Sequence, residues 1–227
     1  MKNFFNKYIG FILLLVPIIW GFNPAIMKLG LNSMSSYEYN FYRLLVCVIV
    51  SLIIVLFNKE FKKIEKKDLF KFVLILCGGY FGFQLFFTVG VKYTSSGTTS
   101  LIMSLLPVCV LIFNLFTKDE QARLTVVLGI FLTVVGIILI ILSENSSGNN
   151  SLYGISLLMG SIICFTIFTL GSKKFTIKLN SNLILFYVSL FSCIIFFGLA
   201  FKDIVNRDFA TIQWVVWFSI IFSGIFA

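Results

Sequence analysis

The sequence predicts an all-α polytopic membrane protein, a bundle of about eight transmembrane helices, on three observations. Hydrophobic residues make up 59% of the 227 positions, and the mean hydropathy is +1.03. Charged residues make up 12%, about half of the share that is typical of soluble domains. Apolar runs of membrane-crossing length recur along the whole chain, and no ten-residue alternating pattern indicates a barrel, so the spans are expected to be helices.

The predicted spans follow the apolar runs in chain order. A helix needs about 20 residues to cross the hydrocarbon core. On that measure the spans are 8–28, 38–57, 70–92, 97–117, 124–142, 152–172 and 183–201, and an eighth span begins near Trp214.

The basic residues sort by loop, and this predicts the orientation. The chain carries 18 Lys and Arg and a net charge of +9. Almost all of these residues lie in short loops between apolar runs, so the charge does not indicate a nucleic-acid partner. Thirteen lie before the first span or in the second, fourth and sixth connections, and four lie in the other connections. The positive-inside rule therefore predicts a multi-pass protein of the cell membrane with its N-terminus in the cytoplasm.

Residue types that carry catalysis and metal binding are sparse. The chain has no histidine, and its five cysteines are scattered with no C-x-x-C spacing. It has no G-x-S-x-G motif, no phosphate loop and no pair of acids inside a span. We therefore expect neither an enzyme, nor a metal site, nor a cofactor.

Arg43 is the one charge in the apolar run NFYRLLVCVIVSLIIVLF. An arginine near the centre of a membrane helix costs about 2.5–3.5 kcal/mol to insert. Tyr39 precedes it by four residues, and Cys47 and Ser51 follow at the same spacing, so the four share one helix face. Glu38 lies about 140° around the helix and is a poor partner. Three interpretations stay open: the guanidinium snorkels to the interface, it binds a carboxylate or phosphate of a substrate, or it pairs with an acid brought close by folding.

The third predicted span has one polar face. Tyr80, Gln84 and Thr88 recur every four residues, so hydroxyl and amide groups share one side of an otherwise apolar helix. Such a face suits either a solute pathway or hydrogen bonds between helices. Gly78 and Gly82 in the same span predict close packing against a neighbouring helix.

Prolines predict bends or breaks in two spans. Pro17 and Pro24 in the first span, and Pro107 in the fourth, each remove a backbone donor. Interrupted helices often surround the binding sites of transporters. The side chains of interest beside these prolines are Trp20, Asn23 and Ser104.

The segment SENSSGNNS at 143–151 predicts a linker between two halves. Residues 10–30 and 154–174 share several glycine and apolar positions at an offset of 144. Because five spans precede the linker, a second copy starts on the opposite side of the membrane, as in inverted-repeat transporters. We predict a first repeat of five helices at 1–142 and an incomplete second repeat at 152–227.

Several stretches together resemble the EamA branch of the drug/metabolite transporter superfamily. They are the dipeptide WG at 20–21 followed by Lys28, EYNFYRLL with Arg43, and SLLPVCVLIFNLFTKDEQARLTVVLGIFLTVVGIILI at 104–140. The resemblance implies ten helices in two inverted repeats around a central cavity, and export of amino acids, other small metabolites or toxic compounds. From Trp214 onward 14 residues remain, about 21 Å of helix, so we expect a truncated form of that fold without its last two helices.

We predict a secondary membrane transporter, an exporter of small metabolites such as amino acids, that works by alternating access. Its candidate binding residues are Arg43, Tyr39, Trp20, Asn23, Tyr80, Gln84 and Ser104, and its candidate helix breaks are Pro17, Pro24 and Pro107. The alternatives are efflux of cationic drugs, and a non-transporting membrane fragment or partner subunit. The expected partners are the small-molecule substrate, the lipid bilayer, and either a second copy or another protein that supplies the missing helices.

Overall fold

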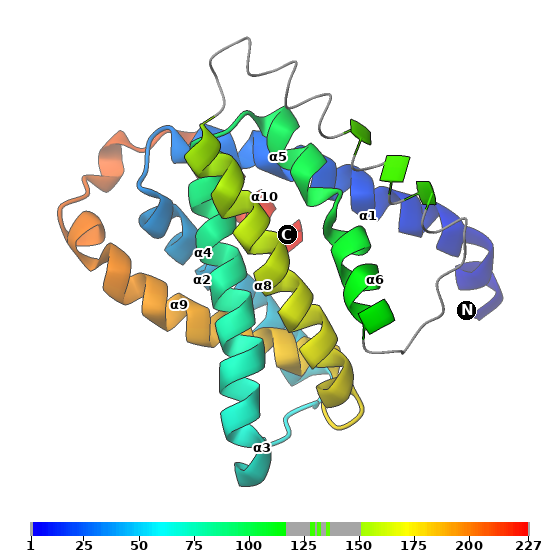
Figure 1. Cartoon of the computed structure of the whole chain (residues 1–227). Helices are drawn as coiled ribbons and strands as arrows, with labels where there is room; N and C mark the ends of the chain where they lie inside the picture. The colour runs from blue at the N-terminus through cyan, green and yellow to red at the C-terminus, as the bar shows by residue number, and fades with distance from the viewer. Residues whose placement is uncertain (1, 117–127, 130, 133–134, 137–150, 227) are drawn as a thin grey trace.

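The computed structural model describes residues 2–116, 128–129, 131–132, 135–136 and 151–226. In this part of the chain the regular elements are helices and none is a strand (Figure 1). Five of the described helices are long and apolar enough to cross a membrane, and Leu15–Leu31 and Trp214–Phe226 are shorter apolar helices. The predicted fold class, an all-α polytopic membrane protein, is confirmed.

Each predicted span within the described residues coincides with one helix or with consecutive helical segments. In chain order these are α1 (Lys2–Leu31), α2 (Ser36–Phe57), α3 (Lys66–Lys71), the π-helical turn η1 (Phe72–Cys77), α4 (Gly78–Lys92), α5 (Ser96–Met103), α6 (Leu106–Phe116), α8 (Leu152–Thr176), α9 (Ser181–Val205), the 3₁₀ turn η2 (Phe209–Thr211) and α10 (Trp214–Phe226). Most of the predicted span at 124–142, apart from residues 128–129, 131–132 and 135–136, lies outside the described residues, as does the linker at 143–151 except for residue 151.

Serine caps set where three of these helices begin. The hydroxyls of Ser35, Ser95 and Ser151 accept hydrogen bonds from the backbone N–H groups of Glu38, Thr98 and Tyr153, at 3.2, 3.0 and 3.2 Å. A serine in this position satisfies one of the donors that the first helical turn leaves unpaired. The short loops between spans therefore carry the residues that start α2, α5 and α8.

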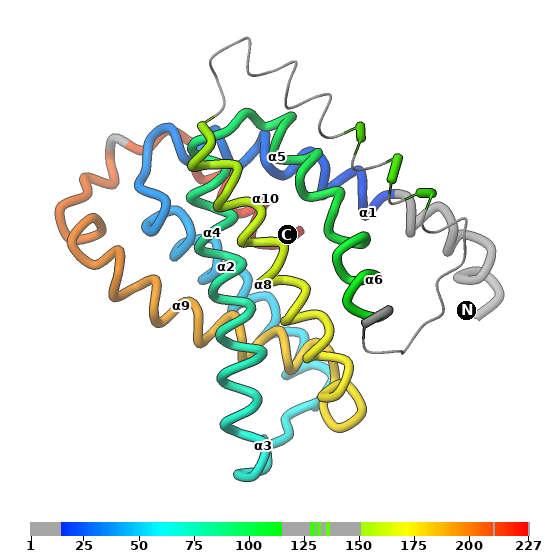
Figure 2. Tube along the Cα trace, viewed as in Figure 1, coloured from blue at the N-terminus to red at the C-terminus, as the bar shows by residue number. Residues whose placement is uncertain are grey.

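The bundle is built on helix pairs that are distant in sequence. α2 lies along α9 and α4 lies along α8, while α1 contacts α10 and α5 (Figure 2). Glycines bring α4 close to α8: a Cβ on Gly79 would lie 3.2 Å from the Cys164 carbonyl oxygen, and one on Gly82 would lie 2.9 Å from Cys164 Sγ. Gly78 meets only its own helix. The predicted close packing is correct, but Gly79, not Gly78, shares the contact face with Gly82.

The expected interruption of the first span at Pro17 and Pro24 is wrong, because α1 runs unbroken through both prolines. Each proline removes one intrahelical hydrogen bond, and the bonds of the flanking turns maintain the helix. In the fourth span the helix ends at Met103 and resumes at Leu106, one residue before Pro107. Proline is well tolerated in a first helical turn, where its missing N–H would have no partner.

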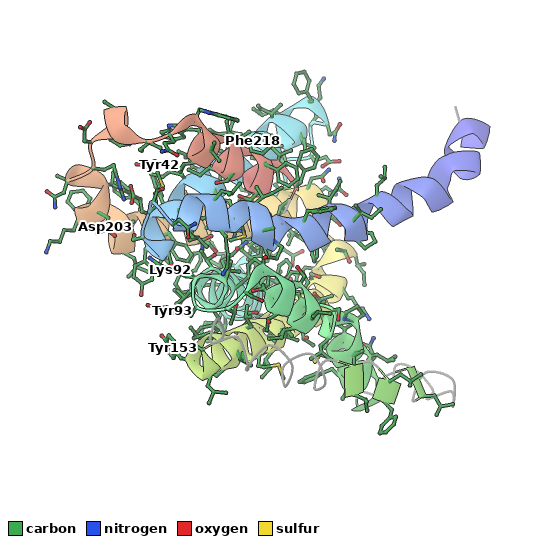
Figure 3. All side chains as sticks on the ribbon, turned by 90° about the horizontal axis from the view of Figure 1, so that it is seen from above. Tyr42, Lys92, Tyr93, Tyr153, Asp203 and Phe218 are labelled. Atoms are coloured by element: carbon green, nitrogen blue, oxygen red, sulfur yellow. The ribbon has the colours of Figure 1, made fainter. Side chains whose placement is uncertain are left out.

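The described loops gather at two opposite ends of the bundle. At one end Lys178 on the α8–α9 turn bonds to Asp68 of α3 at 2.6 Å. At the other end Lys92 Nζ donates to the Met34 carbonyl at 3.5 Å, and Ser151 N–H donates to the Tyr93 carbonyl at 3.1 Å. Figure 3 looks onto this second end, where Lys92, Tyr93, Tyr153 and Asp203 are labelled.

Candidate functional site

Arg43 lies inside the bundle, with only 3% of its surface exposed. Its Nη2 donates to the side-chain oxygen of Gln84 on α4, and its Nη1 lies 3.5 Å from the Met27 sulfur on α1. Among the described residues no carboxylate forms an ion pair with it. Burial excludes the interpretation in which the guanidinium snorkels to the interface. A permanent charge is thus held by neutral groups alone in the part of the chain that the structure describes.

The predicted stripe on α2 does face the interior. Tyr39, Cys47 and Ser51 are buried together with Arg43. On α4, Tyr80, Gln84 and Thr88 are buried as well. The two polar faces therefore meet, and the Arg43–Gln84 hydrogen bond joins them.

Further polar side chains surround this bond. Asn40 Nδ2 donates to the Gln84 carbonyl at 3.1 Å, and Asn23 Nδ2 lies 3.6 Å from the same Met27 sulfur that contacts Arg43. Thr88 follows Gln84 by one helical turn. We call this group the Arg43 cluster: Asn23, Met27, Asn40, Arg43, Gln84 and Thr88.

The Arg43 cluster has hydrogen-bonding capacity that the protein does not use. Asn23 Oδ1, Asn40 Oδ1 and Thr88 Oγ1 are buried and have no hydrogen-bond partner among the described residues. An unpaired buried polar group typically costs about 1–3 kcal/mol. The cluster thus combines three unpaired buried polar atoms with an arginine that has no carboxylate partner among the described residues.

Two apolar cores adjoin the Arg43 cluster. Along α2, Tyr39 belongs to one hydrophobic core and Leu44 to the other, with Arg43 between them. Along α4, Tyr80 and Phe87 belong to different cores on either side of Gln84. Phe83, directly before Gln84, belongs to the same core as Phe87, so both apolar cores adjoin the cluster.

The two predicted tyrosines take part in packing as well as in the polar face. Tyr39 donates to the Ser219 carbonyl on α10 at 3.1 Å, and its hydroxyl lies 2.9 Å from Ser223 Oγ. The ring of Tyr80 contacts the ring of Phe168 on α8, with centroids 5.4 Å apart. Tyr39 therefore sets the position of α2 against α10, and Tyr80 that of α4 against α8.

Two predicted site residues lie apart from the cluster. Trp20 is 42% exposed, and its ring packs edge-on against the ring of Phe165, with the ring centroids 6.1 Å apart. Ser104 is exposed, and its hydroxyl donates to the Leu101 carbonyl at 2.6 Å. Arg43, Asn23 and Gln84 are brought together by the fold, whereas Trp20 and Ser104 are not joined to them.

Sequence reasoning missed Asn40 and Met27 as members of the cluster. Asn40 lies three residues before Arg43 and Met27 four residues after Asn23. Both spacings put the side chains on the same face as a predicted residue. The helical spacing was thus the signal that could have found them.

A second buried charge on α2, that of Glu38, has a partner of opposite charge. Glu38 is fully buried, and Arg207, between α9 and α10, binds it through two hydrogen bonds of 2.8 and 2.5 Å. The hydrogen bond to Glu38 raises the pKa of Arg207 above its ordinary value. Beside this pair, Ser35 Oγ donates to Asp203 at 2.5 Å. These contacts tie the start of α2 to the connection between α9 and α10.

The chain is similar to known proteins in sequence. The model of the EamA-like transporter family matches residues 7–142. A Bacillus subtilis protein called uncharacterized transporter YetK is 25% identical over 186 residues, which cover 81% of this chain and 56% of that protein. A Haemophilus influenzae protein called an uncharacterized transporter is 31% identical over 169 residues, which cover 67% of this chain and 54% of the relative.

A third relative, from Archaeoglobus fulgidus, is also called an uncharacterized transporter. It is 29% identical over 169 residues, which cover 74% of this chain and 59% of that protein. The chain thus spans about half of the length of the curated relatives it matches, from 43% to 59%. No solved structure matches the chain.

Proposed function

Because the chain belongs to the EamA-like transporter family, we propose that it is a secondary transporter that exports small metabolites with an anionic group, such as amino acids, by alternating access. One observation carries the choice of substrate: Arg43 is buried with neutral partners only among the described residues. A guanidinium presents a planar fork of donors that matches a carboxylate or phosphate. A bound carboxylate would supply the counter-ion for Arg43.

The unpaired oxygens of the Arg43 cluster extend this argument. Asn23 Oδ1, Asn40 Oδ1 and Thr88 Oγ1 are available to accept hydrogen bonds from a ligand. A solute that carries both a carboxylate and a donor group, as an amino acid does, satisfies both parts of the cluster. A cationic drug is disfavoured, because no described acid lies in the cluster to neutralise it.

The burial of the cluster fits a transporter between its two open states. Arg43, Gln84 and Thr88 are all sealed from solvent. Alternating access requires a conformation in which the site is closed to both sides of the membrane. In this proposal α2 and α4 separate when the site opens.

Helix contacts support the proposed inverted repeat. If the halves 1–142 and 152–227 are two copies, α1 is equivalent to α8, α2 to α9, and α4 to α10. If each helix is replaced by its equivalent, the contact of α1 with α10 becomes a contact of α8 with α4, and the contact of α2 with α9 becomes itself. All three of these helix contacts are present. Contacts of this kind are what a two-fold axis between repeats requires.

We also propose that the protein lies in the cell membrane with its N-terminus in the cytoplasm. Support comes from the grouping of the lysine-rich segments 59–71 and 173–178 at one end of the bundle. Labelling of a single cysteine introduced at Lys63, in a chain without its native cysteines, with a membrane-impermeant maleimide tests this. Labelling in lysed cells but not in intact cells is expected, and labelling in intact cells contradicts the orientation.

The transport proposal is tested by Arg43→Lys in vesicles that contain the purified protein. The variant keeps the charge and loses the planar fork, so uptake of a carboxylate-bearing solute should fall about tenfold or more. Amino acids, organic acids and nucleosides form the panel of labelled solutes. Protein yield and the thermal midpoint should stay close to those of the parent chain, which shows that insertion is intact.

Arg207→Lys is the matched control. It makes the same substitution at an arginine that pairs with Glu38, and uptake should change less than twofold. Equal uptake by the parent chain and Arg43→Lys would remove Arg43 from the site. Failure of every solute in the panel to move would contradict transport itself.

A further inference from the structure

A hollow lies at the lysine-rich end of the bundle, away from the Arg43 cluster. It has a volume of about 290 Å³ and lies between the segment before α3 and the turn from α8 to α9. Lys62, Lys63 and Lys178 contribute its basic groups, and the buried side chains of Phe175 and Leu179 form its apolar wall. This volume is just below the range for small-molecule sites, about 300–1,000 Å³.

The two acids of the hollow already have basic partners. Asp68 binds Lys178 at 2.6 Å, and Glu65 binds Lys67 at 2.8 Å. The hydrogen bond from Lys67 lowers the pKa of Glu65, which keeps this carboxylate ionised. Both acids are therefore neutralised locally.

Lys62 and Lys63 form no ion pair with any residue that the structure describes. Two adjacent ammonium groups thus remain at the rim of the hollow without a counter-ion from the described chain. The positive-inside rule explains the number of lysines at this end, but it does not require an apolar-walled hollow beside them.

The segment that carries these lysines is held against α9. The hydroxyl of Tyr187 donates to the Lys62 carbonyl at 3.2 Å, and Asn182 Nδ2 lies 3.4 Å from Glu60 Oε2. The ring of Phe61 packs edge-on against Phe186, with centroids 6.1 Å apart. The backbone at Lys62 is therefore positioned by tertiary contacts.

Exposed apolar side chains flank the basic groups. Phe61 and Ile177, each adjacent in sequence to a lysine of the hollow, are 50% and 87% exposed. Phe57 and Phe70, near the two ends of the same connection, are also largely exposed. Alternation of exposed apolar groups with lysines is typical of the interface between headgroups and acyl chains. The hollow is lined by residues at the ends of the candidate membrane spans Lys66–Lys92 and Leu152–Thr176, so a ligand at headgroup depth would also have acyl chains to bury.

We propose that this hollow binds the headgroup of one anionic phospholipid, with its phosphate on Lys62 and Lys63 and its acyl chains along Phe61 and Ile177. Basic pockets at helix ends have the charge and position that anionic headgroups require. Free inorganic phosphate would satisfy the lysines but would leave the apolar side chains uncovered. The proposal does not depend on the transport function or its substrate.

The test measures the thermal midpoint of the full chain in a neutral detergent while lipid is added. Short-chain phosphatidylglycerol should raise the midpoint in a saturable way, because a ligand that binds only the folded state stabilises it. Phosphatidylcholine with the same chains, and inorganic phosphate alone, should not. A Lys62→Gln/Lys63→Gln double variant should bind phosphatidylglycerol about tenfold more weakly or worse, because it removes both ammonium groups that attract the lipid phosphate.

Two further variants make the result specific. Lys66→Gln/Lys71→Gln removes the same charge from the same segment but outside the hollow's lining, and should weaken binding less than twofold. Lys62→Arg/Lys63→Arg keeps the charge and should retain binding. Equal weakening by the two glutamine doubles, an equal response to phosphatidylcholine, or the same stabilisation by phosphate alone would overturn the proposal.

Discussion

Glu38 and Arg43 are five residues apart on α2 and are both buried, yet their charges have different kinds of partner. Glu38, near the start of the helix, is bound by the guanidinium of Arg207 through two hydrogen bonds. Arg43, more than one turn further into the helix, is bound by the neutral side chain of Gln84 and contacts a methionine sulfur. Glu38 has its counter-ion within the protein, whereas no described residue supplies one for Arg43.

The difference separates a charge that holds the fold together from a charge that we propose to be available to a ligand. The Glu38–Arg207 pair joins α2 to the connection between α9 and α10, 169 residues away in sequence. The Arg43–Gln84 bond also joins two helices, but it leaves the net charge of the site uncompensated. Burial alone does not distinguish the two roles, and the charge of the partner does.

The largest expected effect comes from Arg207→Gln, which removes the counter-ion of Glu38. The carboxylate would remain buried without a cation among its described neighbours, so we expect a loss of about 2–4 kcal/mol in the free energy of unfolding. Unfolding of the purified chain in detergent by heat or denaturant measures this. The double variant Glu38→Gln/Arg207→Gln should recover most of the stability, and a loss below about 1 kcal/mol for Arg207→Gln would mean that the pair behaves as an exposed one.

A second substitution would give Arg43 a partner of opposite charge, as Glu38 already has. Gln84→Glu gives Arg43 a counter-ion at the position of its present neutral partner. The free energy of unfolding should be kept or raised, while uptake of a carboxylate-bearing solute should fall about tenfold or more, because the new carboxylate competes for the guanidinium.

Gln213→Glu provides the matched control for this experiment. Gln213 is exposed directly before α10, outside the Arg43 cluster, so the same change there should leave uptake within twofold of the parent chain. Undiminished uptake by Gln84→Glu would show that the solute does not use Arg43.

The smallest expected effect concerns a predicted site residue that lies outside the cluster. Ser104 is exposed and bonds to a carbonyl of its own helix, so Ser104→Ala should change uptake less than twofold. Thr88→Val, which removes a buried unpaired hydroxyl of the Arg43 cluster, should reduce uptake more than Ser104→Ala does. Uptake rates at equal protein content in the vesicles compare the two, and the opposite order would return Ser104 to the site.

Helical spacing predicted much of the candidate site. The stripe of Tyr39, Arg43, Cys47 and Ser51 is buried as its four-residue spacing indicated. The face of Gln84 and Thr88 on α4 was likewise visible in the sequence, because side chains one turn apart lie above each other on any α-helix. Spacing within one helix gave no information on which other helix that face would meet.

The remaining features depend on contacts between distant segments. Gly79 and Gly78 are neighbours with the same local character, and only the position of Cys164 on α8 makes Gly79 the close contact. Trp20 and Asn23 are three residues apart, yet the first is exposed and the second buried. α1 also continues through Pro17 and Pro24, because the lost hydrogen bonds are few compared with those that remain in its turns.

The sequence by itself determined that this chain forms membrane-length helices and which faces of α2 and α4 are polar, because hydropathy and helical spacing are local properties of about 20 consecutive residues. Only the tertiary structure decided that Arg207 meets Glu38 and that Gln84 meets Arg43. Those pairings depend on how helices far apart in the chain pack against each other, and packing is set by the shapes of whole helix surfaces.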